Sequence, residues 1–105
     1  MLVLVINLDA SVDRMRNMSE QLKRMDVSFS RISAVDGGKL SDEFMDSIVP
    51  PFSDILARLD FPKKLTKGEI GCFLSHRKCW QTLLESKEEW ALVLEDDVYI
   101  SDRVK

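Results

Sequence analysis

Residues 2–8 read LVLVINL, a continuous apolar run rich in β-branched side chains. A strand inside a parallel sheet is covered on both faces, so its side chains are apolar without alternation. The run therefore predicts a short, fully buried strand. Residues 90–94 read WALVL, and this second run predicts another such strand. Polar residues follow both runs, at the strand ends where open α/β sheets bind ligands.

The segment after the first run predicts a helix and then a strand. Apolar residues recur at three- and four-residue spacing over residues 12–25, which is typical of an amphipathic helix whose methionines face the core. Either Asp9 or Ser11 is placed to cap this helix. Apolar alternation over residues 27–35 predicts a second strand, ended by the DGG turn at residues 36–38.

A capping box opens the second long helix. Thr66 and Glu69 have the spacing at which each side chain bonds the backbone N–H of the other, and helical periodicity continues to about Ser86. Residues 39–64 are expected to be an irregular insert, with a short helix at 41–48 and a break at prolines 50 and 51. The order strand, helix, strand, helix, strand predicts a single α/β domain over residues 1–105, with a mostly parallel sheet and flanking helices.

Composition excludes several classes of protein. The chain has 15 basic and 18 acidic residues and a formal net charge of −3, so it lacks a basic footprint for nucleic acid. It has no signal-peptide pattern and no run of the roughly 20 apolar residues that span a bilayer.

The cysteines indicate a reducing compartment. Cys72 and Cys79 are about two helical turns apart, roughly 10 Å, which is too far for a disulfide. With no further soft ligand nearby in the sequence, a zinc site is not expected. We expect reduced thiols in a cytoplasmic protein, with Cys72 packed beside Phe73 and Trp80.

Three acidic residues, Glu95, Asp96 and Asp97, follow the second buried run. Adjacent carboxylates repel unless a cation neutralises them or water solvates them. Oxygen ligands suit Mg²⁺ or Mn²⁺, which often bind through one or two carboxylates and substrate phosphates. On an extended chain Glu95 and Asp97 would share a face. A metal site and a solvated acidic strand end are equally compatible with the pattern.

Four blocks of the sequence are distinctive together: VINLD at 5–9 with DR at 13–14, AVDG at 34–37, LTKGEIGCFLSH at 65–76, and LVLEDD at 92–97. In this order they resemble glycosyltransferase family 25, which includes bacterial lipooligosaccharide galactosyltransferases. The resemblance implies a GT-A-like, Rossmann-like fold that binds a UDP-sugar, commonly UDP-galactose, together with Mn²⁺ or Mg²⁺. It makes Asp97 the first choice for the metal contact and Glu95 a metal or ribose contact, with Asp96 in either role.

Other residues of these blocks are candidates for the donor site. A base or ribose is expected at the end of the first strand and the uridine at the end of the second. Arg14 either meets a phosphate or pairs with Asp13, and His76 either touches the donor or makes a structural hydrogen bond. The candidate donor-binding residues are Asn7, Leu8, Asp9, Arg14, Asp36, Gly37, Ser75 and His76.

Inverting sugar transfer also needs a general base beside the acceptor hydroxyl. The family architecture places that base after the metal motif, so we expect this chain to supply donor and metal binding, with little or no transfer alone. The expected acceptor is a lipooligosaccharide or another surface glycan or glycolipid. Peripheral membrane association and homodimerisation through an exposed sheet edge stay open. The alternative is a non-catalytic remnant that associates with itself or a partner.

Overall fold

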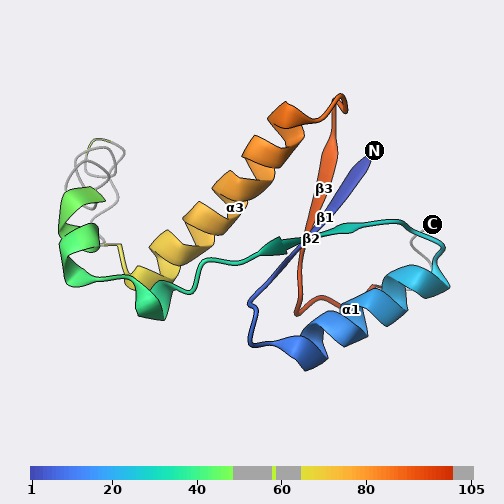
Figure 1. Ribbon diagram of the computed structural model, residues 1–105, viewed down its shortest axis with the longest axis horizontal. Coiled ribbons are helices and arrows are strands. Elements are labelled where there is room, and N and C mark those ends of the chain that lie inside the picture. Colours follow the sequence, from blue (N-terminus) through green and yellow to red (C-terminus); the bar gives the residue numbers. More distant parts are fainter. Residues whose placement is uncertain (49–57, 59–64, 101–105) are drawn as a thin grey trace.

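The computed structural model describes residues 1–48, 58 and 65–100. The elements follow the predicted order (Figure 1): β1 (Leu2–Asn7), α1 (Val12–Arg24), β2 (Ser30–Ser33), the 3-10 turn η1 (Gly37–Lys39), α3 (Lys67–Glu85) and β3 (Ala91–Glu95). Residues 42–48 are helical, as predicted. The expected break at prolines 50 and 51, and most of the predicted insert, lie outside the described residues.

The three strands form one parallel sheet in the order β2-β1-β3. Leu4 of β1 lies opposite Ser30 of β2 on one side and opposite Val93 of β3 on the other. Because β1 is central, residues 3–7 are all buried. The predicted α/β class is confirmed, and the carboxyl ends of the three strands lie at one edge of the sheet.

The two long helices cover opposite faces of this sheet (Figure 1). Leu4 and Ile6 of β1 pack with Cys79 of α3. Val5, which lies between them, packs with Met18 of α1, because successive strand side chains point to opposite faces. The chain crosses one face from β1 to β2 and returns over the other face to β3, as two crossovers of the same hand require when they run in opposite directions along the sheet.

One expectation about the first half of the chain is wrong in its bounds, and another is confirmed in position only. β2 begins at Ser30, later than residue 27, because Val27 and Phe29 pack in the cluster beneath α1 before pairing with β1 begins. Ser11 occupies the N-cap position of α1, but its side chain makes no capping hydrogen bond. Asp9 does not replace it, since the Asp9 carboxylate accepts hydrogen bonds from β2 instead.

The start of α3 is fixed at the carboxyl edge of the sheet. The predicted capping box is confirmed: Thr66 Oγ1 accepts from the Glu69 N–H at 3.2 Å, and Glu69 Oε1 accepts from the Thr66 N–H at 3.3 Å. The first turns of α3 touch η1 directly. A Cβ on Gly71 would lie 2.8 Å from the Gly37 Cα, and one on Gly37 would lie 2.3 Å from the Lys67 carbonyl oxygen. Only glycine at both positions allows this approach.

Several large apolar side chains stay at the surface despite their helical or strand spacing. Trp80 is 50%, Leu84 83% and Trp90 74% exposed. The rings of Phe73 and Trp80 meet edge to face, with centroids 5.8 Å apart. Cys72 is exposed and lines a cleft, so its predicted packing beside these rings is wrong. Successive helical residues point about 100° apart, which separates Cys72 from its neighbour Phe73.

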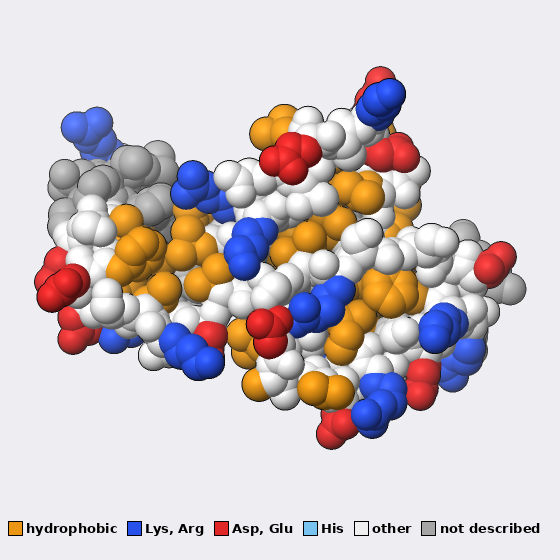
Figure 2. All heavy atoms as spheres, in the orientation of Figure 1, with side chains coloured by type: hydrophobic (Ala, Val, Ile, Leu, Met, Phe, Trp, Pro, Cys, Tyr) orange, Lys and Arg blue, Asp and Glu red, His pale blue; other side chains and the backbone are white. Residues whose placement is uncertain are grey.

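Charged side chains of both signs are interspersed over the face drawn in Figure 2. This face therefore carries no continuous basic surface of the kind that nucleic acid requires. Among the described residues, no helix combines the length and the apolar character needed to cross a bilayer.

Candidate functional site

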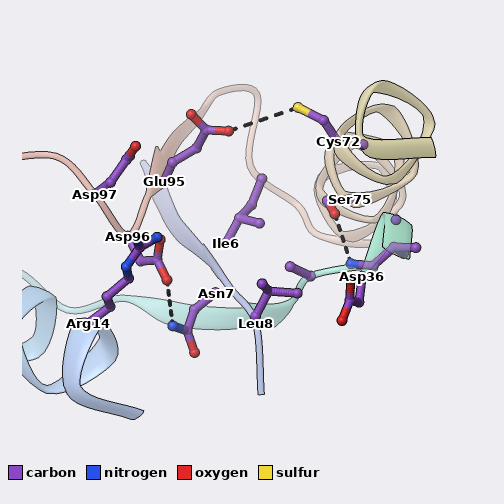
Figure 3. A pocket seen from close by; sticks show the side chains of 14 residues that line it. Ile6, Asn7, Leu8, Arg14, Asp36, Cys72, Ser75, Glu95, Asp96 and Asp97 are labelled. Carbon is purple, nitrogen blue, oxygen red and sulfur yellow. Dashed lines mark hydrogen bonds and ion pairs between the residues drawn. The ribbon is translucent and has the colours of Figure 1, made fainter. Parts of the chain in front are cut away.

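A cleft of about 310 Å³ opens at the carboxyl edge of the sheet (Figure 3). It is lined by the end of β1, the turn after β3, the loop after β2, and residues from the N-terminal parts of α1 and α3. Ligands of open α/β sheets bind beyond the carboxyl ends of the strands, where the strand order reverses. Here β2 and β3 lie on opposite sides of β1, and the cleft lies at their shared edge.

Asn7, the last residue of β1, connects several of the segments around this cleft. Its side chain is buried, with the residue only 2% exposed. Nδ2 donates to the Ser11 carbonyl at 3.0 Å and to Asp96 Oδ2 at 2.7 Å. Oδ1 accepts from Arg31 Nε at 2.9 Å. Asn7 therefore ties β1 to α1, to β2 and to the turn after β3.

Asp96 is the rigid member of the acidic group. Its side chain is 12% exposed, and Oδ1 lies 3.6 Å from Arg14 Nη1, while Asn7 holds the other oxygen. The Arg14 side chain is 63% exposed, so its guanidinium lies mostly in solvent beside the cleft. The alternative pairing of Arg14 with Asp13 does not occur, because Asp13 pairs with Arg16 at 3.1 Å.

Glu95 and Asp97 point in different directions from this fixed carboxylate. The chain turns at residues 96–97, and the Val98 N–H is directed at the Glu95 carbonyl at 3.4 Å. The expectation that Glu95 and Asp97 share a face assumed an extended chain, but the strand ends at Glu95; both residues line the cleft, and their shared face stays a prediction. Figure 3 shows Glu95 directed toward Cys72, with Asp97 on the side of Glu95 that is farther from Cys72. Asp97 is exposed and makes no hydrogen bond or ion pair within the described part of the chain.

Six of the predicted donor-binding residues line the cleft with the three acidic residues: Asn7, Leu8, Arg14, Asp36, Gly37 and Ser75. Asp36 caps η1 by accepting from the Gly38 N–H at 3.0 Å. The Ser75 hydroxyl is buried, accepts from the Val35 N–H at 2.9 Å and donates to the Gly71 carbonyl at 2.8 Å. Ser75 therefore fastens α3 to the loop after β2, and its contact with a donor stays a prediction.

Asp9 and His76 are the two predicted donor-binding residues that do not line the cleft. Hydrogen bonds from Arg31 and from Ser33, together with the positive charge of Arg31, hold the pKa of Asp9 below its ordinary value. His76 Nε2 lies 3.8 Å from Glu95 Oε1 on the α3 side of the cleft. Their donor roles stay predictions.

The sequence analysis did not identify Arg31 or Cys72 as residues of this region. Arg31 interrupts the apolar alternation of the second predicted strand, and that interruption is the only local signal of its contact with Asn7. Cys72 precedes Ser75 by about one helical turn, which places both on the same face of α3 and in the cleft lining. Its sulfur lies 3.9 Å from Glu95 Oε1.

Comparisons with known proteins agree with the resemblance found in the sequence. The family model described as glycosyltransferase family 25 (LPS biosynthesis protein) matches residues 1–105. A glycosyltransferase 25 family member from Aedes aegypti is 34% identical over 96 residues, which cover 91% of this chain and 16% of the relative. Human procollagen galactosyltransferase 2 is 32% identical over 107 residues, which cover 98% of this chain and 16% of the relative.

Not every relative is named as an active enzyme. The probable inactive glycosyltransferase 25 family member 3 of Bos taurus is 34% identical over 107 residues, covering 98% of this chain and 17% of that protein. The chain thus spans less than a fifth of the length of these relatives. The match of the family model over the whole chain shows that this protein belongs to glycosyltransferase family 25.

Proposed function

We propose that the cleft binds the diphosphate of a nucleotide-sugar through a divalent cation held at Asp97. In this proposal the chain supplies the donor site of a transferase that moves a hexose from a UDP-sugar to a surface glycan or glycolipid. Galactose is the favoured sugar because a relative is named a galactosyltransferase. The observation that carries the proposal is the exposed, unpaired Asp97 carboxylate beside a rigid Asp96 and a solvated Arg14.

The carboxylates fit a hard cation. Mg²⁺ and Mn²⁺ prefer oxygen ligands and commonly share them between one or two carboxylates and substrate phosphates. Asp97 is free to bind such an ion directly, whereas Asp96 is oriented by Asn7. The ion would supply charge stabilisation for the departing diphosphate. The positively charged Arg14 side chain, which is mostly exposed to solvent, reaches the same region and is proposed to contact a phosphate oxygen.

The opposite wall of the cleft is proposed to receive the uridine. Leu8 and Gly37 line it, with the half-buried Val35 between β2 and η1. These groups offer an apolar surface bordered by backbone, which suits a planar base. The proposal assigns no general base to the described residues, because each acidic side chain in the cleft already has a role: Asp97 with the cation, Asp96 with Asn7, Glu95 with α3 and Asp36 as the cap of η1.

A second candidate function is that of a non-catalytic homologue that keeps the fold. The relatives named as inactive or probably inactive members of the family favour it. Such a protein need not retain cation-dependent binding of a nucleotide. The presence or absence of that binding therefore separates the two functions.

Isothermal titration of the chain with UDP, with and without Mn²⁺, tests the proposal. We expect one UDP per chain, bound about tenfold or more tightly with Mn²⁺, and loss of this difference in Asp97→Asn. The matched control is Asp26→Asn, which removes a carboxylate beyond the other end of α1; residue 26 has φ 54°, a conformation that asparagine tolerates. Failure of wild-type protein to bind UDP at millimolar concentration would support the non-catalytic homologue.

A further inference from the structure

Three side chains with different ligand atoms meet on the α3 side of the cleft. Cys72, His76 and Glu95 each offer one potential ligand atom, and these atoms all lie within 4.8 Å of one another. Glu95 Oε1 is 3.9 Å from Cys72 Sγ and 3.8 Å from His76 Nε2. Figure 3 shows the first of these contacts, with Glu95 turned away from Asp96.

The fold explains why these residues meet. Cys72 and His76 are four residues apart on α3, so they lie on one face of the helix, one turn apart. Glu95 ends β3, where pairing opposite Ile6 fixes its position beside that face. Two ligands come from one helix and the third from a strand that pairs with β1, so a bound ion would link α3 to the sheet.

We propose that Cys72, His76 and Glu95 bind a borderline-soft divalent cation, with Zn²⁺ as the chemical type. Thiolate, imidazole and carboxylate are the ligands that Zn²⁺ takes in proteins, commonly as three protein ligands and one open position. Zinc-to-ligand distances of about 2.0–2.3 Å in a tetrahedron separate the ligand atoms by roughly 3.3–3.8 Å. Glu95 Oε1 lies 3.8 Å from His76 Nε2 and 3.9 Å from Cys72 Sγ, close to these values, and the three ligand atoms lie within 4.8 Å of one another.

This site is distinct from the proposed donor cation. Asp97 is not a member of it, and its sulfur and nitrogen ligands disfavour Mg²⁺ relative to Zn²⁺. A Zn²⁺ bound at this site would hold the Glu95 side chain at α3. The cation that binds the diphosphate would then be held at Asp97. A zinc site was not expected from the sequence because no further soft ligand lies near Cys72 and Cys79; the group described here uses only Cys72 of the two, together with His76 and with Glu95 from β3.

Cobalt substitution tests the proposal on the reduced, metal-free chain. Co²⁺ added to wild-type protein is expected to give a thiolate-to-cobalt charge-transfer absorption at one ion per chain, which Zn²⁺ then abolishes by displacement. Cys72→Ser should lose this absorption, and His76→Gln and Glu95→Gln should each weaken Co²⁺ binding by about tenfold or more. Asp97→Asn is the matched control: it removes a nearby carboxylate and should leave the absorption unchanged, even where it removes Mn²⁺-dependent UDP binding.

A measurement on the wild-type chain keeps the test independent of the folding of variants. Zn²⁺ should protect Cys72 from alkylation by iodoacetamide, measured by mass spectrometry of the peptide that contains it, and Mg²⁺ should not. The proposal is overturned if wild-type protein shows neither the absorption nor the protection. It is also overturned if a correctly folded Cys72→Ser, checked by circular dichroism, keeps the absorption. Neither result bears on UDP binding at Asp97.

Discussion

Replacing Asn7 with alanine should destabilise the chain more than any other single polar truncation near the cleft. Asn7 is buried and makes three side-chain hydrogen bonds, to Ser11, Arg31 and Asp96. Each bond joins a different segment to the centre of the sheet. The substitution removes all three and leaves the strand itself in place.

The three lost bonds do not cost the same. The Ser11 carbonyl keeps its helical hydrogen bond, and Arg31 keeps its bonds to Asp9 and to the backbone carbonyl of residue 7. The lost bond to each of these two groups therefore costs about 1 kcal/mol of stability or less. Asp96 is largely buried and loses its 2.7 Å partner, which costs about 1–3 kcal/mol. The space left by the amide adds about 1 kcal/mol. We expect a total of about 2–6 kcal/mol, a large share of the stability of an ordinary domain.

Urea denaturation followed by circular dichroism measures this difference in unfolding free energy. The matched control is Asn17→Ala, the same substitution at an exposed position of α1, which should change stability by less than about 0.5 kcal/mol. If Asn7→Ala unfolds within about 0.5 kcal/mol of wild type, the network around Asn7 does not hold the cleft together.

Three further predictions follow from other contacts. Gly71→Ala should lower the unfolding free energy by about 2 kcal/mol or more in the same urea assay, because its Cβ would meet the η1 backbone at 2.8 Å. The control Gly68→Ala, whose nearest contact is 3.9 Å, should be neutral or stabilising. The pKa of Asp9 is lowered by its hydrogen bonds, so the contribution of Asp9 to stability is present above the ordinary value of 3.8 and lost as pH falls below it. Asp9→Asn should therefore lose less stability than wild type between pH 5 and pH 3, measured by urea midpoints. An equal loss in the two proteins would contradict this. Iodoacetamide should modify Cys72 well before Cys79, which is 1% exposed and whose thiol pKa burial raises; equal rates by mass spectrometry would show that α3 opens readily.

The order and type of the elements could be predicted from the sequence because they depend on local periodicity. The run at residues 2–8 required cover on both faces, and β1 is the buried central strand. The capping box at Thr66 and Glu69 set the start of α3. The positions of Trp80 and Leu84 could not be predicted, because an apolar face is buried only where a partner packs on it, and none of the described elements covers these side chains.

The cleft was predictable in its place but not in its internal contacts. Strand polarity brings the end of β1 and the acidic turn after β3 together, so residues 7 and 95–97 were expected at one edge. The choice of partners was not predictable: Asp96 contacts Asn7, and Glu95 contacts α3, because the chain turns immediately after β3. Contacts between residues far apart in the sequence depend on register and side-chain direction, which periodicity does not specify.

Paramagnetic broadening by Mn²⁺ in the presence of UDP tests the central claim most directly. In ¹⁵N-labelled protein, substoichiometric Mn²⁺ with UDP should broaden the backbone amide signals of residues 7–8, 36–37 and 96–97 first, and Asp97→Asn should abolish that pattern. Uniform broadening, broadening confined to the face of α3 around residues 72–76, or a pattern that UDP leaves unchanged would contradict a diphosphate-bound cation at Asp97.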